Sequence, residues 1–502
     1  MNPMQWLPKL KKWEWLVVLT LVTGYFVLAT LNLTRLPIFV DEALYLRWAQ
    51  IAWHDASWRF ISLTDGKQPL YIWFVIPFLK LIQDPLMAGR MASVVAGVGT
   101  ILGLGYLGWL VKDKRTGFYA MLLAILSPYL FFYYRFGVME SLLVASIIWV
   151  SNFSVLLART RRLDIALLLG MLTGLALLVK SSALFFCILI PAAYLLEVDF
   201  KKLWTKQTFT YLLLVSIAWF LALVIYNIQR LSPWMHMIGQ KNAFFTVPYD
   251  QIFAELGRLT NNWADVWRWQ SAYTTAPTVL VAFVGAYMLG RQNRRWLLLI
   301  LIWLFLPMLG TIAVARLFAP RYIIYVTPYL LLLAAYLLAS LKTWDLRLRI
   351  FLLIVLLPGY LLIRLITDPI SYPYTSVDEG YVNGWAAGNG TRQIADWAVN
   401  RVEQIHAPVT IFTEGTFGIL PHGLELFADG RVEGLTIRGL YPIDKLPPPE
   451  ALVSVKTNPE TYLIMNNTPT SDQVDGLELI VSYPKREAAY TMRLFRVLPP
   501  IN

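Results

Sequence analysis

Long apolar runs, separated by short polar and basic connections, fill the first 367 residues of the chain. A helix that crosses a bilayer needs about 20 mainly apolar residues. Applied to this pattern, that length predicts eleven spans, near residues 15–33, 88–110, 117–134, 138–158, 163–180, 183–197, 208–228, 274–290, 296–315, 322–341 and 350–367. We therefore expect a polytopic α-helical membrane protein with about 11 transmembrane helices.

Two further stretches do not fit a span. Residues 69–82 are apolar but too short, which favours a helix lying at the membrane interface. Residues 229–273 are amphipathic and rich in aromatic side chains, and they include Trp234 and His236. Aromatic residues at this density are typical of a membrane–water boundary. This loop is expected either to anchor the chain at the interface or to form a lid over a lipid-linked or sugar substrate.

Basic residues predict the orientation of the spans. Alternate connections each hold three Lys or Arg residues, as does the N-terminal segment with Lys9, Lys11 and Lys12. Short loops of this kind stay in the cytoplasm. The N-terminus is then cytoplasmic, and the outer loops 34–87 and 229–273 are extracytoplasmic, as is the chain from residue 368. The first apolar run lacks a small-residue cleavage site, so it is expected to remain as a span in the cell (plasma) membrane.

Composition supports a membrane protein and argues against nucleic-acid binding. Hydrophobic residues make up 57% of the chain, more than a soluble domain needs. The net charge of +12 is unevenly placed, because residues 1–367 hold 33 Lys and Arg against 15 Asp and Glu, whereas residues 368–502 hold 10 against 16. The excess base therefore lies between apolar segments. The single cysteine, Cys187, excludes an intramolecular disulfide.

The chain changes character after Asp368. Residues 368–390 are rich in Tyr, Gly and Pro and are expected to be a linker. A helical pattern follows over 391–406, with Thr391 as its expected cap, and then short β-like runs at 409–413, 435–437, 451–455, 462–465, 477–481 and 490–497. A helix followed by strands with Gly and Pro between them predicts an extracytoplasmic α/β domain over 391–502.

An acidic pair lies where the first span should leave the membrane. Asp41 and Glu42 follow Pro37, and a carboxylate is costly in hydrocarbon, so the pair needs water or a function. Asp41 could equally cap the helix that continues through Tyr45. Other ionisable residues fall at the outer ends of spans. They are Asp65, Lys67, Arg90, Arg135, Glu140, Lys180, Arg316 and Arg321. The set fits either a catalytic site that pairs a base with phosphate-binding cations or a salt-bridge network within the bundle.

Metal binding has weaker support in the sequence. The four histidines, His54, His236, His406 and His422, lack metal-ligand spacing. No metal ligand set and no other cofactor is assigned, and a divalent ion held with the help of Asp and Glu side chains is left open.

Several short motifs occur along the chain in the same order as in the GT-C glycosyltransferases, which the sequence therefore resembles. The first outer region carries Pro37-x-x-x-Asp41-Glu42-x-x-Tyr45, then Lys67-Gln68-Pro69-Leu70-Tyr71-x-Trp73, then Arg90. Later matches are Arg135-Phe136-Gly137-Val138-Met139-Glu140, Lys180-Ser181-Ser182 and Pro320-Arg321-Tyr322 followed by Pro328. The nearest branch looks like the aminoarabinose and protein O-mannosyl transferases. The likeness covers residues 1–367 and implies a GT-C-like transmembrane domain, to which an extracytoplasmic domain is often appended.

The resemblance implies sugar transfer from a polyprenyl phosphate, with inversion, to a lipid, glycan or protein acceptor outside the cytoplasm. Asp41 would be the general base, with Glu42 beside it, and Glu140 would orient the helix of Asp41 or a neighbouring cation. The donor phosphate would be held by Tyr45, Lys67, Lys180, Arg321 and Tyr322. Further candidates for substrate contact are Arg90, Arg135, Trp234 and His236.

Three positions depart from the aminoarabinose branch. Leu44 stands where that branch has Arg, Gly66 where it has a metal-ligating Glu, and Gln68 where it has the first Pro of Lys-Pro-Pro. We therefore expect a hexosyl- or pentosyltransferase of the cell envelope and no lipid A acceptor. The alternatives are a transporter or flippase of lipid-linked sugars, which would place ionisable groups at the midplane, and an assembly scaffold for surface polymers.

Overall fold

The computed structural model describes residues 9–203, 205–468, 470–487 and 490–500. Its contacts divide the chain into two compact units, which do not follow the chain in one piece. We call them the membrane unit (Met1–Leu31, Phe60–Tyr71 and Arg90–Thr367) and the sheet unit (Asn32–Arg59, Ile72–Gly89 and Asp368–Asn502). The segment around Asp41 thus groups with the C-terminal part of the chain, whereas the sequence alone divides the protein at residues 367 and 390.

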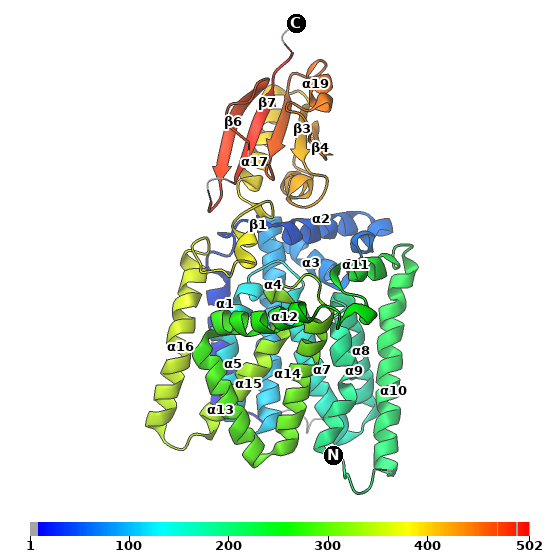
Figure 1. Ribbon diagram of the computed structural model, residues 1–502, viewed down its shortest axis with the longest axis vertical. Coiled ribbons are helices and arrows are strands. Elements are labelled where there is room, and N and C mark those ends of the chain that lie inside the picture. Colours follow the sequence, from blue (N-terminus) through cyan, green and yellow to red (C-terminus); the bar gives the residue numbers. More distant parts are fainter. Residues whose placement is uncertain (1–8, 204, 469, 488–489, 501–502) are drawn as a thin grey trace. The chain divides into compact units, whose positions relative to one another are not determined.

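Helices of the apolar region correspond to the predicted segments. They are α1 (Lys12–Thr30), α3 (Leu70–Leu81), α4 (Pro85–Val111), α5 (Lys114–Leu126), α6 (Pro128–Tyr134), α7 (Glu140–Thr160), α8 (Leu163–Val179), α9 (Ala183–Ile188), α10 (Lys206–Tyr226), α11 (Met237–Phe245), α12 (Leu256–Trp269), α13 (Ala276–Gln292), α14 (Arg294–Val314), α15 (Thr327–Ser340) and α16 (Trp344–Thr367). In Figure 1 the long helices of the membrane unit run beside one another, and α12 crosses them.

The predicted number of eleven spans is not confirmed. Among the described residues, seven helices are long and apolar enough to cross a membrane, or eight if the bent pair α5 and α6 is one span. The predicted span 183–197 breaks into α9 and a 3₁₀ segment at Ile190–Leu196, because Pro191 cannot continue the helix. The α3 helix has 12 residues, which is too short to span, as its sequence predicts. The chain is a multi-pass, mostly helical membrane protein.

Small residues allow close helix packing inside the membrane unit. A Cβ on Gly285 of α13 would overlap the backbone of Leu333 in α15, and one on Gly170 of α8 would lie 2.7 Å from the carbonyl oxygen of Ala218 in α10. Such contacts are the usual way in which membrane helices approach each other. The α15 helix is buried over most of its length, from Thr327 to Leu338. It forms the centre of this unit.

The sheet unit contains the predicted C-terminal α/β fold. Its elements are β1 (Ile38–Phe39), α2 (Val40–His54), β2 (Ala387–Gly388), α17 (Thr391–Ile405), β3 (Val409–Glu414), α18 (Leu424–Ala428), β4 (Leu435–Leu440), α19 (Pro449–Val455), β5 (Thr461–Met465), β6 (Leu477–Pro484) and β7 (Thr491–Val497). The large sheet has the order β4-β3-β5-β7-β6, with β3 parallel to β4 and β5, and β7 antiparallel to its two neighbours.

Helices cover both faces of this sheet. Trp397 of α17 packs on Tyr462 of β5 with ring centroids 4.8 Å apart, whereas Ala451 and Val455 of α19 join Phe412 in the core of the other face. The predicted strand at 451–455 is therefore wrong, because Pro449 starts a helix there. The expected cap Thr391 is also wrong, since Gly390, at φ 84°, precedes the helix instead.

Candidate active site

The acidic pair lies in the first turn of α2, and the two carboxylates have different surroundings. Glu42 is fully buried, and its Oε2 accepts a hydrogen bond of 3.1 Å from the backbone N–H of Phe39. This bond caps the helix N-terminus, so the capping role considered for Asp41 belongs to Glu42. Asp41 is 8% exposed at the start of the same helix.

One face of α2 carries three of the conspicuous side chains. Asp41, Tyr45 and Trp48 are spaced four and three residues apart, so they lie along the same side of the helix. The rings of Tyr45 and Trp48 are 6.0 Å apart. Arg47 instead forms ion pairs with Asp429 at 2.8 Å and Glu425 at 3.4 Å. Since Glu425 belongs to α18 and Asp429 follows it directly, α2 is fixed within the sheet unit.

In the membrane unit, cations gather around the loop before α3. Asp65 forms an ion pair with Lys241 at 2.6 Å and lies 3.7 Å from Lys67. The next residue, Gln68, donates a 2.6 Å hydrogen bond to the hydroxyl of Ser181, which directly follows Lys180. One carboxylate thus serves two ammonium groups, and the loop is bonded to the end of α8.

A second group of charges lies where α7 begins and α8 ends. Glu140 is 3% exposed, and its Oε1 is 2.7 Å from the ammonium of Lys180. Each charge suits its own helix end, with the acid at an N-terminus and the cation at a C-terminus. Lys180 and Arg321 both lie over the ring of Tyr322, at 5.0 Å and 5.3 Å from its centroid. Glu140 thus pairs with a neighbouring cation, and its role in the reaction stays a prediction.

We call Lys67, Lys180, Lys241 and Arg321, with Asp65 and Glu140, the cation cluster. Its two halves are joined through Phe245, which lies 5.7 Å from the ammonium of Lys241 and 6.5 Å from the ring of Tyr322. The four cations outnumber the two acids, and the three lysine side chains are between 18% and 29% exposed. A cluster with an excess of partly accessible cations can bind a phosphate through charge-assisted hydrogen bonds.

Two other predicted arginines, Arg90 and Arg135, have contacts elsewhere in the membrane unit. Arg90 is fully buried, with its guanidinium 5.8 Å from the ring of Phe136. Arg135 donates to the carbonyl oxygens of Leu31 at 2.6 Å and Leu365 at 3.2 Å, and so ties α1 and α16 together. Its predicted contact with substrate stays a prediction.

Trp234 and His236 lie in the loop that precedes α11. Both side chains are exposed, and their rings are 6.4 Å apart. The Nδ1 of His236 is 3.0 Å from the carbonyl oxygen of Pro233 in the same turn. These contacts are local to the loop.

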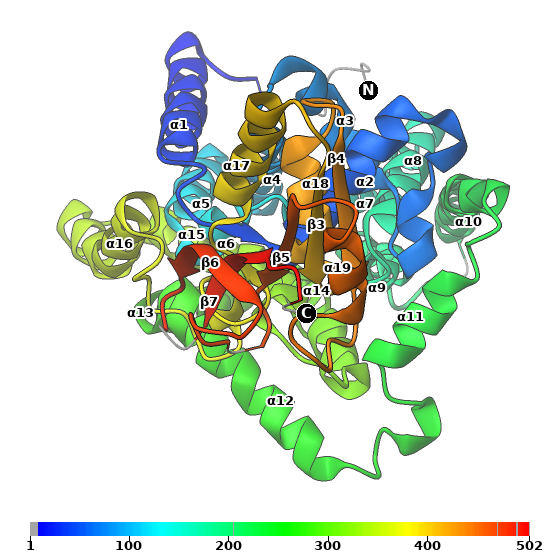
Figure 2. The same ribbon diagram turned by 90° about the horizontal axis from the view of Figure 1, so that it is seen from above.

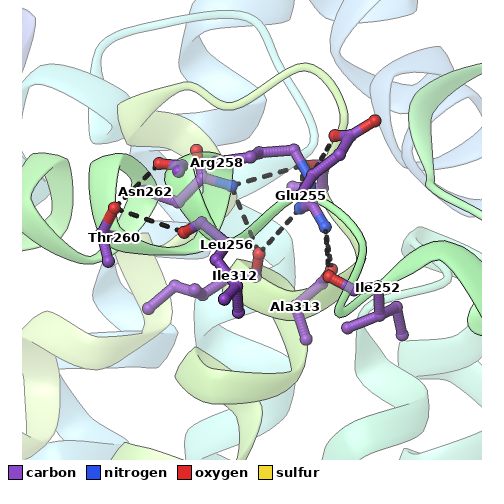
Figure 3. Close-up of polar contacts among 10 residues, drawn as sticks. Ile252, Glu255, Leu256, Arg258, Thr260, Asn262, Ile312 and Ala313 are labelled. Carbon is purple, nitrogen blue, oxygen red and sulfur yellow. Dashed lines mark hydrogen bonds and ion pairs between the residues drawn. The ribbon is translucent and has the colours of Figure 1, made fainter.

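Residues 229–273, which we call the aromatic loop, are hydrogen-bonded to the C-terminal end of α14. Carbonyls at a helix C-terminus have no partner within the helix, and here the loop supplies partners for four of them. Arg258 donates to Ile312 and Ala313 at 3.3 and 3.0 Å (Figure 3) and to Ala315 at 2.9 Å. The backbone N–H of Val247 donates to Val314 at 2.8 Å. Figure 2 shows α11 and α12 at the periphery of the membrane unit.

Asn262 strengthens this attachment. It is buried, and its amide donates to the carbonyls of Ile312 and Ala315 at 3.2 and 3.3 Å. The attached segment of the chain continues to Arg321 and Tyr322. The loop thus holds the backbone that leads to two members of the predicted phosphate site.

Three residues of this site were missed by sequence reasoning. Lys241, Arg258 and Asn262 all belong to the loop 229–273, whose predicted role rests only on its aromatic residues. Lys241 and Arg258 carried a usable signal, since a cation in a loop expected outside the cytoplasm goes against the positive-inside pattern. Asn262 carried no comparable signal.

The departure at Gly66 has a structural cause. Gly66 has φ 65°, and a Cβ there would overlap the carbonyl oxygen of Met237 and the Cβ of Lys241. A larger residue, such as the glutamate expected from the aminoarabinose branch, does not fit this position. Within the described ranges, no group of three or more His, Cys, Asp or Glu side chains is arranged to hold a metal ion.

Comparison with known proteins supports the expected resemblance. Residues 66–226 match the family model described as dolichyl-phosphate-mannose-protein mannosyltransferase. These residues include Lys67, Glu140 and Lys180 of the cation cluster. No curated protein sequence matches the chain.

Solved structures match over nearly the whole chain. ArnT from Cupriavidus metallidurans in the apo state has a TM-score of 0.57 at 14% identity, covering 97% of this chain and 99% of that one. The same enzyme bound to undecaprenyl phosphate gives 0.56 at 13% identity, with the same coverage. The apo oligosaccharyltransferase of Archaeoglobus fulgidus gives 0.51 at 12% identity, covering 89% and 69%. The chain therefore has the GT-C fold of ArnT, as its ordered motifs predict.

Proposed function

We propose that this protein is a glycosyltransferase that moves a hexose or pentose from a polyprenyl phosphate to an extracytoplasmic lipid, glycan or protein acceptor. The observation that carries the proposal is the cation cluster, in which Lys180 is oriented by a buried glutamate and Lys67 shares Asp65 with Lys241. A phosphate leaving group needs nearby cations more than it needs a proton, and such a cluster supplies them. The ArnT fold supports the same reading, since one of the matching structures of that enzyme holds undecaprenyl phosphate.

In this proposal Asp41 acts on the acceptor. As general base it removes the proton of the attacking hydroxyl, and as an anion it stabilises positive charge that develops on the sugar ring. The oxygen–carbon bond to the acceptor forms as the bond from the anomeric carbon to the phosphate oxygen breaks, on the opposite face, so the configuration inverts. Burial of Glu42 as a cap fixes the helix that carries Asp41.

Orientation follows from the basic connections. With the positive loops in the cytoplasm, the N-terminus is cytoplasmic, and the cation cluster, Asp41 and the C-terminal sheet are extracytoplasmic. The donor would then be used on the outer side of the cell membrane.

A transporter or flippase of lipid-linked sugars is the competing function. Transporters commonly place ionisable groups in broken helices near the bilayer midplane. Glu140 instead begins α7, and Lys180 directly follows the end of α8. Charges at helix ends favour the transferase.

The test uses the full-length protein purified in detergent with undecaprenyl-phosphate mannose, glucose and arabinose as separate donors. A membrane lipid and glycan extract supplies acceptors, and mass spectrometry detects released undecaprenyl phosphate. We expect release with one donor and none with Lys67→Ala, while the exposed Lys80→Ala control releases at the wild-type rate. Movement of donor across liposomes without bond cleavage would instead establish the transporter.

A further inference from the structure

Two exposed aromatic side chains of the sheet unit lie beside the start of α2. Trp385 is 55% exposed and Phe417 is 48% exposed. A large aromatic ring buries much apolar area when it binds a ligand. For a ring exposed to water, this burial is favourable. Neither residue takes part in the proposed sugar transfer, so their surroundings must indicate whether they bind a ligand.

Backbone pairing places Trp385 near the first residue of α2. Strands β1 and β2 pair Ile38 with Gly388 and Phe39 with Ala387, and the N–H of Val40 continues the ladder to the carbonyl of Ala386 at 3.0 Å. The ladder ends here, because Val40 is the first residue of α2, and Trp385 directly precedes Ala386. Gly418 lies between the two segments, because a Cβ there would be 2.7 Å from Val40 and 3.8 Å from the Trp385 ring.

Phe417 extends the same surface along α2. Its ring centroid is 6.4 Å from that of Trp48, which shares the helix face of Asp41 and Tyr45. The ring of His422 lies 5.7 Å away on another side of Phe417. Trp385 therefore lies near the first turn of α2, and Phe417 contacts Trp48 two turns after Asp41.

The backbone of Trp385 is held at three successive carbonyls. The ammonium of Lys485 donates to Gly384 at 2.5 Å, the amide of Asn466 donates to Trp385 at 2.9 Å, and Val40 donates to Ala386 as described above. Lys485 also donates to the side-chain oxygen of Asn466 at 2.6 Å. A tryptophan with an exposed ring thus stands on a rigid backbone.

Buried charges maintain this arrangement. Lys485 is only 6% exposed, and burial lowers its pKa to about 7, with Glu414 opposing the shift. Glu414, equally buried, accepts hydrogen bonds from the backbone N–H groups of Asn466, Asn467 and Thr468 at 2.8, 2.6 and 2.9 Å. Burying charges costs stability. An indole whose backbone is fixed before a ligand binds has a lower ordering cost on binding.

The chemistry around the rings favours a sugar. The exposed neighbours on the same segments are Thr416 and Asn467, which offer a hydroxyl and an amide, while the charged Glu414 and Lys485 are buried. One face of a pyranose ring carries mainly C–H groups that pack on an aromatic ring, and its hydroxyls need such polar partners. A phosphate would need exposed cations there, and an acyl chain would need a continuous apolar surface.

We propose that Trp385 and Phe417 form a platform that binds a sugar ring of a glycan acceptor beside Asp41. The platform narrows the acceptor from lipid, glycan or protein to glycan, and in assigning that ligand to the acceptor side it rests on the proposed function. Trp385 and Phe417 would determine acceptor specificity, whereas the chemistry stays with Asp41.

The experiment measures binding without a donor, so it does not depend on whether the chain transfers sugar. Saturation-transfer NMR is recorded on the full-length protein in nanodiscs with mannotriose and maltotriose, and with a serine- and threonine-containing peptide as a separate probe. Three variants are compared with the wild type: Trp385→Ala, Trp385→Phe and Phe417→Ala. Trp58→Ala is the matched control, since Trp58 is 42% exposed in the same unit, in the 3₁₀ turn Ala56–Trp58 that follows α2.

We expect saturation of ring C–H protons of one oligosaccharide, with Kd raised about tenfold by either alanine variant, as loss of one aromatic stacking contact predicts. Trp385→Phe should retain part of the affinity, and Trp58→Ala all of it. Unchanged oligosaccharide binding in Trp385→Ala and Phe417→Ala would overturn the inference, as would no oligosaccharide binding or selective binding of the peptide. If binding behaves as expected but no donor is cleaved, the platform stands and the proposed function fails.

Discussion

Arg258 gives the sharpest prediction about how the aromatic loop is held. Its side chain is 12% exposed and donates to three carbonyls at the end of α14, while its partner Glu255 is 56% exposed. A hydrogen bond to a charged group contributes about 1.5–3 kcal/mol. We expect Arg258→Ala to lower the free energy of local opening by about 3 kcal/mol. This is less than the sum of the three hydrogen bonds, because water and the loop relax when the side chain is removed.

Hydrogen–deuterium exchange on the full-length protein tests this value. The N–H groups of Val247 and Arg316 bond across the loop and the end of α14, to Val314 and Phe245. A loss of about 3 kcal/mol corresponds to roughly 100-fold faster exchange at these two amides. Glu255→Ala is the control, because an exposed ion pair contributes less than about 1 kcal/mol.

Arg258→Lys should give an intermediate rate, since an ammonium lacks the planar fork of the guanidinium. Exchange at Val247 and Arg316 that is the same in Arg258→Ala and wild type would refute the view that this side chain fastens the loop.

Three other predictions follow from single contacts. Gly66→Ala should lower the melting temperature and weaken donor binding, because φ is positive and a Cβ meets α11; an unchanged thermal scan would contradict this. Glu140→Gln should raise KM for the donor more than it lowers kcat, since Lys180 keeps its charge but loses its orienting partner; an equal loss in both would point to direct catalysis. Burial depresses the pKa of Lys485 to about 7, so the unfolded chain binds more protons above that pH, and stability of the sheet should rise between pH 7 and 9 by up to about 1 kcal/mol per unit; Lys485→Met should remove this rise in exchange measurements on β5 and β7.

Much of the fold was predictable because apolar length and basic loops act locally. All eleven predicted segments contain helix, yet the length of 183–197 did not reveal that Pro191 would break it. Strand content in the tail was also predictable from short apolar runs, except at 451–455, where the proline that starts α19 outweighed the β-branched residues.

The candidate site was predictable where residues mark helix ends. Glu140 and Lys180 were chosen for their position at the outer ends of spans, and they form an ion pair. Lys241 was not found, because its contact with Asp65 depends on how α11 packs against Gly66. The two-residue pairing of β1 with β2, which places Trp385 near the start of α2, leaves no periodic signal in either segment.

The central claim is that Asp41 is the base of a sugar transfer from a polyprenyl phosphate. The most direct measurement compares Asp41→Asn, Glu42→Gln and the wild type in the donor-release assay, each first checked for correct folding. We expect Asp41→Asn to lower release of undecaprenyl phosphate by at least about 100-fold, the lower range for loss of a general base. Glu42→Gln, which loses only charge at the helix cap, should keep most of the activity. Near-wild-type release by Asp41→Asn would contradict the claim.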